Sequence, residues 1–156
     1  MQSNRAIKPI QPDQLQQLLD LYQHLHRKDE PLPADLILQE TWDQILAMPG
    51  HHPLGLYIDE RLVSSCILII VPNLTRGCRP YGLIANVVTH ADYRGRGLGK
   101  QTLRHTLDVA WKQNCYKVML MTGRKDETVF RFYESVGFNQ DEKQAFIAKP
   151  NRQKDS

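Results

Sequence analysis

Residues 81–113 pass from an apolar run through a glycine-rich turn into a helical pattern, and this segment constrains the fold most. Residues 81–89 have the apolar content of a strand, and residues 97–113 repeat apolar side chains at helical spacing. The turn between them, Arg94-Gly95-Arg96-Gly97-Leu98-Gly99, has glycine at alternate positions. A second strand is predicted over residues 116–122, so the helix crosses between two strands that we expect to be parallel.

The rest of the pattern adds antiparallel strands and further helices. Two strand-like runs, residues 54–58 and 62–71, are joined by a short polar link that is typical of a hairpin. The other predicted elements are a strand over residues 5–10, helices over 13–25 and about 34–48, a helix after Asp126, and a last polar strand or two within 138–148. The fold class is therefore α+β (mixed α/β), with a central mixed sheet flanked by about four helices.

Length and composition limit the class of protein. The 156 residues suit one domain, predicted over residues 1–149 with a polar tail at 150–156. No run reaches the roughly 18 apolar residues of a membrane helix, and the first residues lack a secretory pattern, so we expect a soluble cytoplasmic protein with no membrane partner. Three cysteines without paired spacing predict neither a disulfide nor a metal site. The net charge of +3 is spread out, so no nucleic-acid partner is expected.

The glycine turn is suited to binding a phosphate. Glycines let backbone N–H groups approach a ligand closely, and a helix that begins there adds unpaired N–H groups and the positive end of its dipole. Arg94, Arg96 and Lys100 add positive charge. The spacing fits neither the dinucleotide fingerprint, where Lys100 or Thr102 would have to be glycine, nor the P-loop, where Gln101 would have to be Ser or Thr. A nucleotide-binding regulatory domain is therefore disfavoured.

Two motifs resemble those of the GNAT superfamily of acyl-CoA-dependent N-acetyltransferases. Arg94-x-x-Gly97-x-Gly99 is similar to the first signature, and Phe132-Tyr133-x-x-x-Gly137-Phe138 is similar to the second. The order of elements over residues 82–138 also resembles that family. The resemblance implies a sheet splayed between its fourth and fifth strands, with acetyl-CoA bound in the opening and no metal cofactor.

The resemblance also assigns expected roles to residues. The implied cofactor-binding residues are Val87, Val88, Thr89, Arg94, Gly95, Arg96, Gly97, Leu98, Gly99, Lys100 and Asp126. The first three are expected to bind the pantetheine arm through their backbone, and the turn to bind the pyrophosphate. Asp126 is either a cofactor contact or only a helix cap.

Tyr133 is the implied catalytic acid, because a phenol with a pKa near 10 can donate a proton to a departing thiolate at neutral pH. Many relatives carry a glutamate where this chain has Ala85, so no base is assigned. Other candidates for handling the amine's proton are Asn86, which could position a water, and His51, His52, Glu40 and Asp43.

The predicted function is transfer of an acetyl group from acetyl-CoA to a primary amine of a small molecule or a peptide. The acceptor is left open, and a homodimer is compatible with the pattern. The alternative is a non-catalytic acyl-CoA-binding module, which the missing glutamate favours and the presence of Tyr133 opposes.

Overall fold

A computed structural model of the chain describes residues 3–26 and 29–150. The chain forms two compact units, residues 1–120 and residues 121–156, and each is described by itself. The single domain expected over residues 1–149 stays a prediction. Most of the polar tail expected at 150–156 lies outside the described residues.

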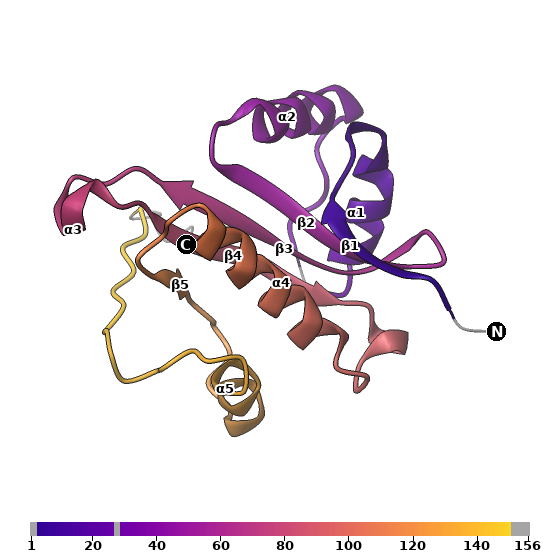
Figure 1. Ribbon diagram of the computed structural model, residues 1–156. Helices are drawn as coiled ribbons and strands as arrows, with labels where there is room; N and C mark the ends of the chain where they lie inside the picture. The colour runs from indigo at the N-terminus through magenta and orange to yellow at the C-terminus, as the bar shows by residue number, and fades with distance from the viewer. Residues whose placement is uncertain (1–2, 27–28, 151–156) are drawn as a thin grey trace, which may run out of the picture. The chain divides into compact units, whose positions relative to one another are not determined.

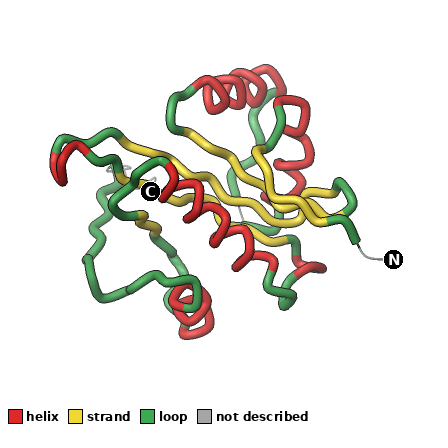
Figure 2. The backbone as a smooth tube through the Cα atoms, viewed as in Figure 1, coloured by secondary structure: helices red, strands yellow, loops and turns green. Residues whose placement is uncertain are grey.

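The first unit is built on a five-stranded sheet with the strands in chain order (Figure 1; Figure 2). The strands are β1 (Arg5–Pro9), β2 (His51–Ile58), β3 (Arg61–Val71), β4 (Tyr81–Thr89) and β5 (Val118–Leu120). Neighbours from β1 to β4 are antiparallel, and β4 and β5 are parallel. The predicted hairpin and the mixed α+β sheet are therefore confirmed, although β5 is shorter than residues 116–122.

Helices cover both faces of this sheet. They are α1 (Leu15–Tyr22), α2 (Asp35–Ala47) and α4 (Leu98–Lys112), whereas the short α3 (Thr75–Cys78), between β3 and β4 in the chain, buries no residue. Trp42 of α2 is buried in one core cluster with Tyr57, whereas Leu98 of α4 is buried in another with Leu56. Because successive side chains of a strand point to opposite faces, α2 and α4 lie on opposite sides of β2. Within the described part of the chain, no helix is long and apolar enough to span a membrane.

The second unit contains α5 (Glu127–Glu134). The side chain of Asp126 accepts a hydrogen bond from the backbone N–H of Val129 at 3.0 Å, so the predicted helix cap is confirmed. The prediction of one or two strands within residues 138–148 is wrong, since no residue there is in a strand. Residues 139–144 are polar, and Phe146 and Ile147 are 88% and 66% exposed, so this segment has no buried face that would stabilise a strand.

Gly50, which follows α2, offers a test of how tightly the first unit is packed. It has a φ of +79°, and a Cβ there would overlap the backbone carbonyl of Ile70. Gly77 also has a positive φ, +71°, but a Cβ there would meet no atom within 4 Å. We expect Gly77→Ala to lower the free energy of unfolding by about 1 kcal/mol, the cost of the left-handed backbone. We expect Gly50→Ala to lower it by about 3 kcal/mol in urea unfolding. Equal losses of unfolding free energy for the two variants would contradict a steric overlap between a Cβ at residue 50 and the Ile70 carbonyl.

Candidate active site

The pairing of β3 with β4 contains one extra residue on the β4 side. Ser65 pairs with Val88, and Ile67 pairs with Ala85, so two residues of β4, numbers 86 and 87, lie opposite a single residue of β3. The first of the two, Asn86, has a φ of +54°. This is a β-bulge with its first residue in the left-handed region, a geometry that bends a strand and interrupts its pairing.

The two edges of β4 differ beyond this bulge. On the β5 side, pairing covers only residues 82–84. No strand of the described chain pairs with this edge over residues 85–89, although β3 still pairs with the other edge. The predicted opening between the fourth and fifth strands is confirmed. Its unpaired backbone groups can bind an extended ligand in the way an added strand would.

The glycine turn and the start of α4 follow directly from β4. Gly95 and Gly97 have φ values of +76° and +74°, and a Cβ at either position would meet no atom within 4 Å. Glycine therefore suits both positions because of the left-handed backbone, and the space beside each residue is open. No side chain caps α4. Among the described residues, Gln101 is the first in the helix whose N–H is paired, at 3.1 Å from the Gly97 carbonyl. The preceding N–H groups are left for a ligand, which fits a pyrophosphate.

Arg94 has a role that its place in the motif does not indicate. Its Nε donates to the backbone carbonyl of Thr89 at 3.1 Å, and its Nη2 donates to the carbonyl of His24 at 2.9 Å. The side chain thus links the turn to the residues that follow α1. Arg96 is exposed and lies over the Tyr93 ring, 5.2 Å from its centroid. The two arginines therefore differ, since Arg94 bonds to the backbone of β4 and of the segment after α1, whereas Arg96 stacks on a ring.

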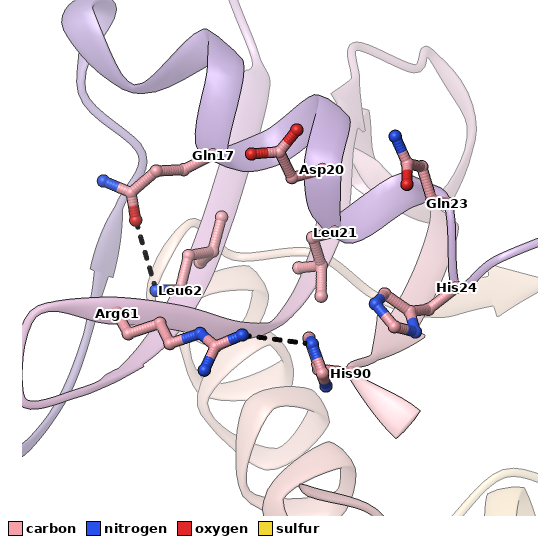
Figure 3. A pocket seen from close by; sticks show the side chains of 8 residues that line it. All are labelled: Gln17, Asp20, Leu21, Gln23, His24, Arg61, Leu62 and His90. Carbon is pink, nitrogen blue, oxygen red and sulfur yellow. Dashed lines mark hydrogen bonds between the residues drawn. The ribbon is translucent and has the colours of Figure 1, made fainter. Parts of the chain in front are cut away.

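A polar hollow of about 240 Å³ lies where α1 meets the end of β4 (Figure 3). The rings of His24 and His90 are 4.0 Å apart there, and Arg61 Nη2 lies 3.2 Å from His90 Nε2. The backbone N–H of Ala91 also donates to His24 Nδ1 at 3.3 Å. Burial lowers the pKa of His90, and the charges of His24 and Arg61 lower it further. His90 is therefore neutral at pH 7.

The histidine cluster was missed by sequence reasoning. Its members are His24, which follows α1, Arg61, which begins β3, and His90, which follows β4, and no local spacing indicates that they meet. Ala91 and the His24 ring that it contacts are 67 residues apart.

Tyr133 and Asp126 belong to the second unit, so their approach to the turn stays a prediction. The Tyr133 ring is half-buried, with centroids 5.0 Å from Phe132 and 6.1 Å from Phe138. Asp126 forms an ion pair with Arg124 at 3.1 Å, in addition to capping α5. The described residues contain no group of three or more His, Cys, Asp or Glu side chains that could hold a metal ion.

Residues 15–138 match the sequence model of the Acetyltransferase (GNAT) family, and they include the bulged strand, the glycine turn and α5. The chain belongs to the GNAT acetyltransferase family. Among solved structures, this GNAT chain is similar to a protein of Agrobacterium tumefaciens str. C58 that is described as an acetyltransferase. The two are 41% identical, with a TM-score of 0.86, over 92% of this chain and 99% of the other.

Other relatives carry more specific names. A glucosamine 6-phosphate N-acetyltransferase of Trypanosoma brucei brucei is 39% identical over 60% of this chain and 58% of its own length. This chain thus spans little more than half of that curated relative. The crystal structure of glucosamine-6-phosphate N-acetyltransferase from Arabidopsis thaliana has a TM-score of 0.79 at 20% identity, over 96% of this chain and 99% of the other, which shows a shared fold.

Replacing Arg94 tests its link between the turn and α1. We expect Arg94→Ala to lower the free energy of unfolding by about 1–2 kcal/mol, because two hydrogen bonds to backbone carbonyls are lost. Arg104→Ala removes an exposed arginine from α4 and serves as the control, with a change below about 0.5 kcal/mol. Urea unfolding measures both. A loss no larger for Arg94→Ala than for Arg104→Ala would show that the link contributes nothing to stability.

Proposed function

We propose that this protein is an N-acetyltransferase that moves an acetyl group from acetyl-CoA to a primary amine, and that the acceptor is an amino sugar phosphate. One observation carries the proposal. In a chain of the GNAT family, the unpaired edge of β4 leads directly into a turn and helix start with free N–H groups. An extended arm that ends in a pyrophosphate matches that sequence of backbone groups.

Each part of the opening has a role in this proposal. The backbone of Val87, Val88 and Thr89 binds the pantetheine arm. The pyrophosphate is bound by residues of the turn and the start of α4, which are Arg94, Gly95, Arg96, Gly97, Leu98, Gly99 and Lys100. Asp126 joins them if it contacts the cofactor as well as capping α5. When bound, acetyl-CoA supplies an acetyl group activated as a thioester.

The chemistry needs few side chains. A backbone N–H at the bulge polarises the thioester carbonyl as a preorganised dipole. The amine nitrogen forms a bond to the acetyl carbon, the C–S bond breaks, and Tyr133 gives its phenolic proton to the departing thiolate. The amine nitrogen loses one proton to water, since Ala85 cannot accept it, and the Tyr133 phenolate regains a proton from water.

The names of the curated relatives support the choice of acceptor. Four matching proteins, from Trypanosoma brucei brucei, Oryza sativa subsp. japonica and Arabidopsis thaliana, are named glucosamine 6-phosphate N-acetyltransferases, one of them with the word "probable". The matches cover 40–60% of this chain, so the acceptor is a proposal and glucosamine 6-phosphate is the first compound to test.

The proposal is tested by binding and then by turnover. At about 100 times the Kd, acetyl-CoA should stabilise the folded protein by about 2.7 kcal/mol, measured by thermal unfolding with CoA and ATP as comparisons. Free thiol should then appear with glucosamine 6-phosphate, and more slowly with glucosamine, which lacks the phosphate. Stabilisation by CoA without thiol release for any amine would favour the binding module. Stabilisation by ATP alone would overturn the assignment.

Tyr133→Phe tests the proposed acid. We expect kcat to fall by about 100-fold or more because the thiolate loses its proton donor, while the Kd for acetyl-CoA stays the same. Tyr116→Phe, which removes a phenolic hydroxyl from the first unit, is the control and should leave kcat unchanged. Turnover by Tyr133→Phe at the rate of the unaltered protein would remove Tyr133 from the mechanism.

A further inference from the structure

The polar hollow between α1 and the end of β4 contains a contact between two nitrogen atoms that can both donate. Arg61 Nη2 lies 3.2 Å from His90 Nε2 (Figure 3). A guanidinium group only donates, so this contact is a hydrogen bond only if His90 Nε2 carries no proton. The position of the His90 proton therefore decides what the hollow can bind.

The other ring nitrogen of His90 is held by the backbone. Nδ1 accepts a hydrogen bond from the backbone N–H of Asp92 at 3.1 Å. A backbone N–H always donates and its direction is fixed by the chain, whereas the side chain of Arg61 is exposed and can rotate. The neutral ring has one proton, and an accepting Nδ1 places that proton on Nε2. His90 Nε2 and Arg61 are then both donors at the hollow.

His24 has the same arrangement. Its Nδ1 accepts from the backbone N–H of Ala91 at 3.3 Å, so Nε2 carries the proton when the ring is neutral. The His24 ring lines the hollow, with its centroid 4.0 Å from that of His90. Three side chains of the hollow, His24, Arg61 and His90, therefore offer N–H donors.

The charges around these donors are mixed. Arg61 lines the hollow, and Arg94 Nη2 donates to the His24 carbonyl at 2.9 Å. Among the described residues that line the hollow, Asp20 is the only acid, and Asp92 lies nearby with a side chain that is 83% exposed. All four charged residues are exposed, so water and salt screen charges that nearly balance. The N–H donors therefore decide which kind of ligand the hollow prefers.

We propose that this hollow binds a phosphate group, whose oxygens accept hydrogen bonds from Arg61 and from the Nε2–H groups of His24 and His90. The three terminal oxygens of a phosphate match donors on three side chains, whereas a carboxylate has two oxygens. An oxygen that accepts from both Arg61 and His90 also replaces a contact between two donors with two hydrogen bonds.

The size of the hollow limits its ligand. At about 240 Å³ it is smaller than the pockets of roughly 300–1,000 Å³ that enclose drug-sized ligands. It therefore suits inorganic phosphate or the phosphate group of a small metabolite, and these two sources share the same recognition chemistry.

The hollow is separate from the turn that is proposed to bind the pyrophosphate. Leu21 and Leu62 of its lining belong to the core cluster of Trp42, whereas Leu98, the first residue of α4, belongs to the cluster of Leu56. The hollow and the start of α4 therefore lie on opposite faces of the sheet. This inference goes beyond the proposed acetyl transfer and does not depend on it.

NMR spectra of the histidine rings test the site directly. At pH 7, proton–nitrogen correlations within the rings should place the proton of His90 on Nε2. Inorganic phosphate, added at constant ionic strength, should shift the ring signals of His24 and His90 but not those of His105 on α4, and acetate should bind more weakly. A proton on Nδ1 of His90, no response of these two rings to phosphate, or acetate binding as tight as phosphate binding would each overturn the inference.

Three variants each remove one donor. Arg61→Gln removes the guanidinium, while His24→Asn and His90→Asn keep an oxygen acceptor near the place of Nδ1 and lose Nε2–H. We expect each variant to raise the Kd for inorganic phosphate about tenfold, because each loses a hydrogen bond to a charged group.

The matched control is Arg104→Gln, which removes an exposed arginine from α4. We expect it to change the Kd for inorganic phosphate less than about twofold, since the lost charge is remote and screened. A rise as large as that of Arg61→Gln would mean attraction by overall charge and would overturn the inference. Because Arg61 is exposed, Arg61→Gln still tests the site if a histidine variant does not fold.

Further titrations distinguish the sources of the phosphate. Glucosamine 6-phosphate that shifts both rings with a Kd at least about tenfold below that of inorganic phosphate would assign the site to a phosphate ester, and weaker binding would assign it to the free ion. With CoA at saturation, inorganic phosphate should still shift both rings, and loss of that response would overturn the separate site. Thiol release plays no part in these measurements. If the rings respond to phosphate but no amine causes thiol release, the proposed function fails and this site stands.

Discussion

The extra residue in β4 is the constraint on which the rest of the site depends. Before the bulge, β4 pairs on both edges, with β3 and with β5. After it, β4 pairs only with β3, and the chain runs on into the glycine turn and α4. The bulge bends β4 just where its pairing with β5 has ended, so the opening on the β5 side begins at this bend. The asparagine at the bulge tolerates the left-handed backbone at low cost.

The turn is held from the side of α1 as well as from β4. Arg94 bonds to carbonyls at the end of β4 and just beyond α1, and Ala91 donates to the His24 ring. His24 and Arg61 also lie beside His90, and burial together with these neighbours lowers the pKa of His90, against the effect of Asp92. The glycine turn and the residues after α1 are thereby joined within the first unit.

Local signals predicted the elements well and the contacts between them poorly. Apolar runs and short polar links predicted the hairpin and the crossover, and the Asp126 cap follows from a short-range rule. The bulge carries no such signal, because its position depends on which β3 residue pairs with which β4 residue. The strand or two predicted within residues 138–148 is absent, because a strand needs a partner and the local sequence does not show whether one exists. The contact between Arg94 and His24 joins residues that are 70 positions apart, so only the fold reveals it.

The bulge carries no ionisable side chain, and within the proposed function this favours an acceptor amine that is already largely neutral. The side chains of Ala85 and Asn86 take up no proton at pH 7. An alkyl amine such as lysine, with a pKa of about 10.4, is only about 0.04% neutral at pH 7 and would need a base. The amine of an amino sugar is flanked by oxygen-bearing carbons, which withdraw electrons and lower its pKa, so a larger share is already neutral. A site that orients the amine without deprotonating it therefore fits an amino sugar better than a polyamine or a lysine side chain.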